Sequence, residues 1–313
     1  MKNKPILILT GDPRSIFLEI FFKSFKKNKF KSPLLLISSK KILVSQMRKN
    51  KFKKKIRFIH LKDVKKSKLD NESINLVDVG YSQKKQNEYL KNCFDISFKL
   101  IKSGFTNKFI NGPISKAQFL NKKFLGITEY ISKKFNIKKI AMLIYNNDLS
   151  VCPLTTHLPI KLVSKKINQK KIKEKIELID NFFRKNLNIK PKIAITGLNP
   201  HCESILKFNE DKDIILPSIK SLKKRGYKVD GPFPADTIFL KQNRKNYNVI
   251  LGMYHDQVLT PIKTLKEYDA FNITLGLPFY RISPDHGPNI NMINKNKSNP
   301  LSLVKALKFL DKK

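Results

Sequence analysis

Several residue types are scarce in this sequence of 313 residues, which contains no tryptophan, three cysteines and eleven glycines. The cysteines, Cys93, Cys152 and Cys202, are odd in number and unevenly spaced. This pattern argues against both a disulfide framework and a zinc ribbon. It is typical of a protein from the reducing cytoplasm. None of the glycines forms G-x-G-x-x-G or a P-loop, so the Rossmann fingerprint is absent.

Long hydrophobic runs are also missing. No apolar stretch approaches the roughly 20 residues that span a bilayer. The first apolar run, "PILILT" (Pro5 to Thr10), is too short for the hydrophobic part of a signal peptide and predicts a buried strand. We therefore expect a cytoplasmic protein without a membrane partner.

Acidic residues are few: 24 Asp and Glu stand against 64 Lys and Arg, a formal net charge of +40. Such a charge can indicate binding to nucleic acid or to an acidic membrane. The lysines, however, are spread along the chain in runs such as "KKNKFK" and "KKINQKKIKEK", together with many Asn and Ile, as AT-rich codon usage would produce. A basic nucleic-acid-binding protein built on an enzyme-derived fold stays a minority interpretation. Attraction to anionic small molecules is the preferred consequence.

Short β-branched runs alternate with longer amphipathic segments, which predicts an α/β fold with a largely parallel sheet. Expected strands include Pro33–Ser38, Ile140–Tyr145 and Lys192–Leu198. One helix is expected over 83–102 and another over 166–187, where Ile172, Ile176, Ile179 and Phe183 recur at three- and four-residue spacings. A last helix is expected after Asn299 as N-cap and Pro300 in its first turn.

Three of the five histidines each follow a predicted strand. His157 ends "VCPLTTH", His201 ends "AITGLNPH" and His255 ends "LGMYH". The carboxyl ends of parallel strands meet at one edge of a sheet, and neutral imidazole is the commonest metal ligand. A shared catalytic metal site is one interpretation. Hydrogen-bonded loop residues are the other, since the spacings match no local metal motif.

A second set of candidates suits anionic groups. "NGPISK" places backbone N–H groups and Lys116 at a strand-to-helix turn. Thr128 lies at the expected start of a helix, where its side chain could simply be the helix cap. Lys263, Asn272 and Arg281 are spaced nine residues apart. Singly, each could equally be a solvated surface group.

Together these segments resemble the 4-hydroxythreonine-4-phosphate dehydrogenase family of vitamin B6 biosynthesis. The family's ordered motifs stand here as "GDP", "NGPISK", "GITE", "TTHLP", "GLNPHCE", "GPFPADT", "MYHDQ" and "NITLGLPFYRISPDHG". They run in the family's order from Gly11 to Gly287, and the last two are long and specific.

The resemblance implies a two-domain fold like that of isocitrate and isopropylmalate dehydrogenases, with largely parallel sheets. We expect one domain over 1–127 with 275–313, a second over 128–274, and an active site in the interdomain cleft. It also implies a homodimer in which the partner subunit contributes to the active site.

The implied reaction is NAD-dependent oxidation of 4-phosphohydroxy-L-threonine, with metal-assisted decarboxylation to 3-amino-2-oxopropyl phosphate. NADP is possible in place of NAD, and the divalent metal could be Zn, Mg, Mn or Co. By position in the motifs, the metal ligands are His157, His201 and His255, and the substrate-binding residues are Thr128, Lys263, Asn272 and Arg281. Lys263 or Asp236 would relay the proton. No cofactor-binding residue is assigned.

Two segments depart from the family pattern. Ile127 replaces the histidine of G-H-T-E, which removes a polar contact expected at the substrate phosphate. "NPHCE" is one residue shorter than the family motif and lacks its glycine. A related dehydrogenase acting on another phosphorylated hydroxy acid, such as 4-phosphothreonate, is therefore a second possibility.

Overall fold

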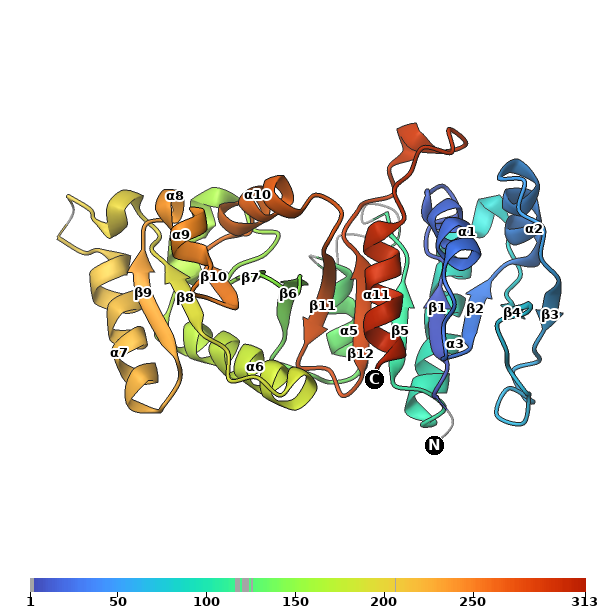
Figure 1. Ribbon diagram of the computed structural model, residues 1–313, viewed down its shortest axis with the longest axis horizontal. Helices are drawn as coiled ribbons and strands as arrows, with labels where there is room; N and C mark the ends of the chain where they lie inside the picture. The colour runs from blue at the N-terminus through green and yellow to red at the C-terminus, as the bar shows by residue number, and fades with distance from the viewer. Residues whose placement is uncertain (1–2, 116–118, 120–123, 125, 206) are drawn as a thin grey trace. The chain divides into compact units, whose positions relative to one another are not determined.

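The chain folds into two compact units, residues 1–130 with 278–313 and residues 131–277. The structure, a computed structural model, describes residues 3–115, 119, 124, 126–205 and 207–313 (Figure 1). The domain boundaries expected from the sequence, after 127 and 274, lie three residues before those of the two units. Lys116 lies outside the described residues.

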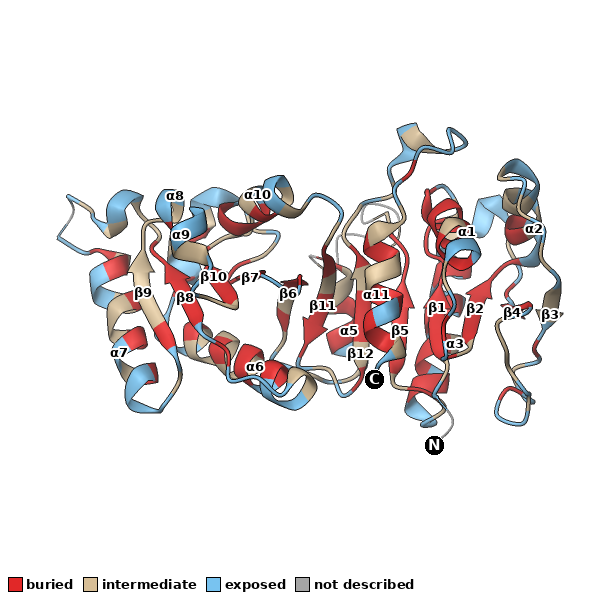
Figure 2. Cartoon of the chain, in the orientation of Figure 1, coloured by how far each residue is buried: buried red, intermediate tan, exposed pale blue. Residues whose placement is uncertain are grey.

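Unit 1 is built on six parallel strands in the order β3-β4-β2-β1-β5-β12. The strands are β1 (Ile6–Leu9), β2 (Leu34–Ser38), β3 (Ile56–Phe58), β4 (Ile74–Asp78), β5 (Lys108–Asn111) and β12 (Tyr280–Pro284). The helices are α1 (Phe17–Lys27), α2 (Lys40–Lys49), α3 (Gln86–Lys102), α5 (Ile127–Lys134), which continues into unit 2, and α11 (Leu301–Asp311). β1, β2 and β5 are buried along their whole length (Figure 2), as expected for strands covered on both faces.

Unit 2 also has six strands, in the order β11-β6-β7-β10-β8-β9. They are β6 (Ala141–Tyr145), β7 (Ser150–Pro153), β8 (Ile193–Thr196), β9 (Val229–Phe233), β10 (Val249–Gly252) and β11 (Phe271–Leu275). β6 runs antiparallel to β7 and β11, while β7, β10, β8 and β9 are parallel. The helices are α6 (Gln169–Leu187), α7 (Leu216–Lys224), α8 (Ala235–Ile238), α9 (Lys241–Arg244) and α10 (His255–Lys266).

Short helical turns complete the two units. The 3-10 turns are η1 (Gln83–Lys85), η2 (Ile160–Leu162), η3 (Ser164–Lys166), η4 (Pro200–Cys202) and η6 (Ile290–Met292), and η5 (Asp211–Ile215) is a π turn. Among the described residues, no helix is both long enough and apolar enough to cross a membrane.

The amphipathic pattern accounts for α6. Its predicted apolar stripe, Ile172, Ile176, Ile179 and Phe183, is at most 4% exposed. Asn168 caps the helix by accepting the N–H of Lys171 at 2.9 Å. The cap expected for α11 is shifted by one position, because Pro300 is the N-cap while the Asn299 side chain accepts the N–H of Leu301.

Two loops of unit 1 approach so closely that they require glycine. A Cβ atom on Gly112 would lie 2.3 Å from the carbonyl oxygen of Thr10 and 2.8 Å from Cγ of Phe17. Gly11 has φ +80°, and its Cβ would lie 2.4 Å from the carbonyl oxygen of Pro113. The contact aligns the ends of β1 and β5, which are adjacent strands.

The change Gly112→Ala should therefore lower the free energy of unfolding by about 3 kcal/mol, since overpacking against backbone cannot be relieved by a side-chain rotation. Urea unfolding would measure the change. Gly80→Ala is the matched control, because nothing lies within 4 Å of the added atom there. Equal stability of the two variants would contradict the close approach.

Candidate functional site

The three histidines predicted to bind metal follow three neighbouring parallel strands of unit 2. His157 lies after β7, His255 after β10 and His201 after β8, and β10 pairs with both of the other strands. Parallel pairing places the carboxyl ends of these strands at one edge of the sheet.

Two of these histidines lie side by side. The ring centroids of His157 and His255 are 6.0 Å apart, and the ring planes are inclined by 35°. With metal–nitrogen bonds of about 2.1 Å, two imidazoles on one metal have centroids roughly 5–6 Å apart. The spacing is therefore compatible with two ligands of a single ion.

An acidic neighbour orients His255. Its Nδ1 lies 2.6 Å from Oδ1 of Asp256. A carboxylate in this position favours the tautomer with hydrogen on Nδ1, which leaves the Nε2 lone pair for a metal. Asp256 itself is exposed, as expected for the first turn of α10.

His201 differs from the other two in its backbone conformation. It lies in η4, where it has φ 57° and Cys202 has φ 63°. Two consecutive non-glycine residues in the left-handed region are unusual, and they occur where the family motif has its glycine. In the described part of the chain, no group of three or more His, Cys, Asp or Glu side chains is arranged to hold a metal ion. The structure thus brings His157 and His255 together but does not add His201 to them.

The Gln257 side chain connects the loops that carry the histidines. Its Oε1 accepts the hydroxyl of Thr196 at 2.8 Å and the N–H of Met253 at 2.7 Å, and its Nε2 donates to the carbonyl oxygen of Gly197 at 2.8 Å. The carbonyl oxygen of Met253 in turn accepts the hydroxyl of Thr155 at 2.8 Å. One buried amide therefore links the loop of His255 to the loop of His201, and Met253 links it to the loop of His157.

Gln257→Leu should disrupt this network, because leucine has a similar size but cannot replace any of the three hydrogen bonds. We expect a loss of about 3 kcal/mol in the free energy of unfolding, at about 1 kcal/mol for each bond. Metal affinity should fall about 10- to 100-fold, as for other groups that orient ligands. Gln242→Leu on exposed α9 is the control and should change neither quantity. Unfolding curves and a metal titration that match the control would rule out this role.

A buried carboxylate shapes the loop of His201. Asp211 is fully buried, and its oxygens accept the N–H groups of Leu198 at 2.6 Å and Asn199 at 3.1 Å. Burial raises the pKa of the Cys202 thiol to about 11, and the negative charges of Asp211, Asp236 and Glu203 add to this effect. Cys202 is therefore a neutral thiol at pH 7.

Asp236, Lys263 and Asn272 occupy different elements of unit 2. Asp236 is exposed on α8, directly after β9. Lys263 lies two turns along α10 from His255, which corresponds to a rise of about 12 Å between the two Cα atoms. Asn272 on β11 has a buried Oδ1 without a hydrogen-bond partner. Such an atom is a candidate contact for a ligand.

Unit 1 brings together the other two residues predicted to bind substrate. Arg281 on β12 is 3% exposed, and its Nη1 donates to Oγ1 of Thr128 at 3.4 Å. Its Nε donates to Oδ1 of Asn111 at 2.8 Å. Burial lowers the pKa of the guanidinium to about 10, while the Glu129 carboxylate opposes that shift. A desolvated guanidinium of this kind is suited to a phosphate or carboxylate.

Sequence reasoning missed three residues of these sites. Asn111 had a signal, because it stands where the family motif T-G-P has threonine. Gln257 lies in "MYHDQ", two residues after His255, yet nothing in the sequence shows that its side chain turns inward. Asp211 lies 14 residues after Gly197 and had no signal in the sequence.

The chain matches the family described as pyridoxal phosphate biosynthetic protein PdxA over residues 29–310. It is 36% identical over 318 residues to the 4-hydroxythreonine-4-phosphate dehydrogenase of Sulfurihydrogenibium sp. (strain YO3AOP1), covering 97% of this chain and 96% of the relative. It is 29% identical over 323 residues to the D-threonate 4-phosphate dehydrogenase of Pectobacterium atrosepticum, covering 98% of each.

Solved structures agree with this assignment. The chain superposes on the 4-hydroxythreonine-4-phosphate dehydrogenase of Klebsiella pneumoniae with a TM-score of 0.82 at 27% identity, covering 98% of each chain. Isocitrate dehydrogenase from Methylococcus capsulatus shares the fold, with a TM-score of 0.53 at 10% identity over 96% of this chain and 83% of that one. The predicted α/β fold of the isocitrate dehydrogenase type is thereby confirmed. Membership implies a nicotinamide dinucleotide cofactor and a phosphorylated hydroxy-acid substrate. The chain belongs to the PdxA family and is a dehydrogenase of that family.

Proposed function

We propose that this protein uses NAD to oxidise 4-phosphohydroxy-L-threonine, and that the oxidised product loses CO₂ to give 3-amino-2-oxopropyl phosphate. The observation that carries the proposal is the His157–His255 pair, whose ring centroids are 6.0 Å apart. His201 follows a strand that ends at the same edge of the sheet. Family membership supplies the reaction class.

His157, His201 and His255 would hold a divalent metal, for which Zn, Mg, Mn and Co are all candidates. When bound, a divalent metal supplies Lewis-acid polarisation to the hydroxyl oxygen that becomes a carbonyl. The donor chemistry fits, because the Asp256 carboxylate leaves the Nε2 lone pair of His255 available.

The protein's side chains would then handle the proton and the charges. Lys263 or Asp236 accepts the proton of the secondary hydroxyl, while the hydrogen on the same carbon leaves as hydride to the nicotinamide. The resulting β-keto acid breaks its bond to the carboxylate carbon and releases CO₂. The bonding electrons remain as an enolate, which takes up a proton at that carbon to give 3-amino-2-oxopropyl phosphate. Lys263, Asn272, Thr128 and Arg281 would bind the phosphate and the carboxylate.

A second candidate substrate is a phosphorylated threonate. Ile127 at the start of α5 precedes Thr128 and replaces the histidine of the family motif. A relative of similar identity is a D-threonate 4-phosphate dehydrogenase.

The experiment is NADH formation at 340 nm by metal-loaded protein, with 4-phosphohydroxy-L-threonine and D-threonate 4-phosphate compared and NADP tested in parallel. Faster turnover of the first substrate with NAD would support the proposal. Turnover of only D-threonate 4-phosphate would show that the second candidate substrate is the correct one. Turnover of neither compound would contradict both candidates.

Ile127→His tests the departure directly. Restoring a charge-assisted hydrogen bond is worth about 1.5–3 kcal/mol, so kcat/KM for 4-phosphohydroxy-L-threonine should rise about 10-fold or more. Ile127→Leu keeps the position apolar and should leave kcat/KM near the wild-type value. No gain from histidine would show that position 127 does not contact the substrate.

A further inference from the structure

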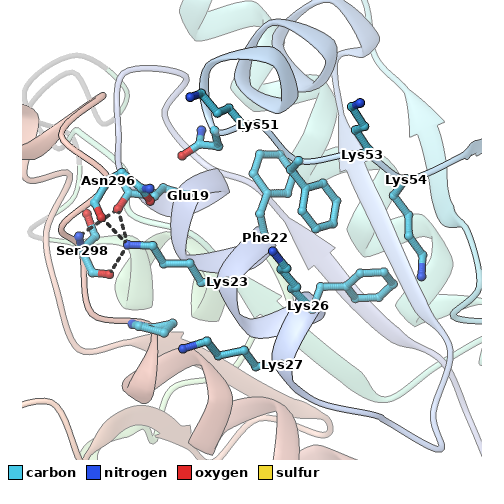
Figure 3. A pocket seen from close by; sticks show the side chains of 14 residues that line it. Glu19, Phe22, Lys23, Lys26, Lys27, Lys51, Lys53, Lys54, Asn296 and Ser298 are labelled. Atoms are coloured by element: carbon cyan, nitrogen blue, oxygen red, sulfur yellow. Dashed lines mark hydrogen bonds and ion pairs between the residues drawn. The ribbon is translucent and has the colours of Figure 1, made fainter.

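A lysine-lined pocket lies in unit 1. Its volume is about 720 Å³, and it is formed by α1, by the segment that follows α2 and by residues 296–300. Six lysines line it: Lys23, Lys26, Lys27, Lys51, Lys53 and Lys54. Figure 3 shows the first three on α1 and the other three on the segment opposite.

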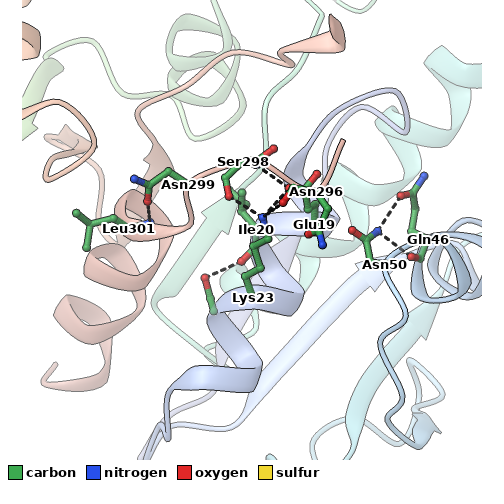
Figure 4. Close-up of polar contacts among 10 residues, drawn as sticks. Glu19, Ile20, Lys23, Gln46, Asn50, Asn296, Ser298, Asn299 and Leu301 are labelled. Carbon is green, nitrogen blue, oxygen red and sulfur yellow. Dashed lines mark hydrogen bonds and ion pairs between the residues drawn. The ribbon is translucent and has the colours of Figure 1, made fainter. Parts of the chain in front are cut away.

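One of these lysines has a structural role. Lys23 Nζ donates to Oε1 of Glu19 and to the carbonyl oxygens of Asn296 and Ser298, each at 2.9 Å (Figure 4). The same Glu19 oxygen accepts the N–H of Ser298 at 2.8 Å. These bonds fix the 296–298 segment to α1 and neutralise the one carboxylate among the described residues of the lining.

The remaining lysines are not compensated by carboxylates. Within the described chain, no ion pair involves Lys26, Lys27, Lys51 or Lys53, and all four are exposed. Lys54 lies over the ring of Phe25, 5.0 Å from its centroid. Five ammonium groups around one concavity repel one another and raise the local concentration of anions.

The lining of the pocket also contains aromatic and polar groups. The rings of Phe22 and Phe52 stack with centroids 4.6 Å apart, and Phe52 is only half-buried. Ser298 lines the pocket, is 6% exposed, and its hydroxyl oxygen has no hydrogen-bond partner. Buried hydroxyls normally have partners, so this one is a candidate contact for a bound ligand.

We infer that this pocket binds a small anion carrying a run of phosphate groups. Its volume falls within the range of about 300–1,000 Å³ that small-ligand sites have. Lysine ammonium groups are suited to phosphate as point charges, and several of them around one pocket match several phosphates. An inorganic polyphosphate and a nucleoside triphosphate share this chemistry, and Phe52 offers a ring face to a base in the second case. The inference does not depend on the proposed substrate.

Calorimetric titration of the full chain with inorganic tripolyphosphate and with ATP, at 150 mM salt, tests the inference. The variant Lys26→Gln/Lys27→Gln/Lys53→Gln should weaken tripolyphosphate binding at least 10-fold. Lys62→Gln/Lys66→Gln/Lys91→Gln removes the same charge from exposed positions of the same unit and should change it less than 2-fold. Circular dichroism would show that both variants are folded.

Competition separates this pocket from the cofactor site. Tripolyphosphate binding that persists with saturating NADH and is lost in the pocket variant supports the inference. Tighter binding of ATP than of tripolyphosphate, with mutual competition, would identify a nucleotide as the ligand. Absence of saturable binding, equal loss in both variants, or displacement by NADH would overturn the inference.

Discussion

His255→Ala should reduce NADH formation by about 10³-fold or more. The imidazole is half of the His157–His255 pair, and a metal's charge stabilisation in the transition state is worth several kcal/mol, at 1.36 kcal/mol for each factor of ten. The protein should stay folded, because the His255 side chain is 36% exposed and lies outside the core. Stopped assays at 340 nm with metal-loaded protein measure the loss.

His60→Ala is the matched control, since His60 is an exposed histidine of unit 1 that contributes to no predicted site. A metal titration of each variant separates ligand loss from other effects. His157→Ala and His201→Ala should lose metal affinity as His255→Ala does. Full activity of His255→Ala, or a metal affinity of this variant equal to that of the wild type, would contradict the proposed role of the histidines as metal ligands.

The elements that could be predicted from sequence are those with a local apolar pattern. In α6 the pattern is a stripe at three- and four-residue spacings, and in β1 and β2 it is a short continuous apolar run. The expectation that strand ends cluster His157, His201 and His255 followed from parallel pairing alone. Their common sheet edge was therefore predictable, whereas their mutual distances depend on the loops.

What could not be predicted depends on contacts between distant segments. Gln257 bonds to residues 60 and 61 positions earlier, and Arg281 bonds to Asn111 from 170 positions away. No spacing in the sequence specifies such partners. The lysine-lined pocket was hidden for a related reason: its lysines lie within runs that look like ordinary solvated surface. Only folding shows that two of these runs face each other across a concavity.

Arg281→Met should lower kcat/KM by about 10²- to 10³-fold and also destabilise unit 1. Methionine removes the buried cation proposed to bind the substrate and leaves Oδ1 of Asn111 without its donor. Breaking a buried charged interaction costs about 3–5 kcal/mol, largely through the partner left behind. Arg281→Lys keeps a charge but loses the planar fork, so we expect an intermediate loss of activity with less destabilisation.

A second substitution separates binding from folding at this position. The Glu129 carboxylate favours the charged form of Arg281, so Arg281→Met removes a favourable charge interaction of that carboxylate. Arg281→Met/Glu129→Gln removes that charge and should recover much of the lost free energy of unfolding, because the neutral amide is less costly to bury. Activity should stay low, since no cation returns to the site. If activity instead recovers together with stability, Arg281 acts only as a support for the fold and the substrate's anionic groups are bound elsewhere.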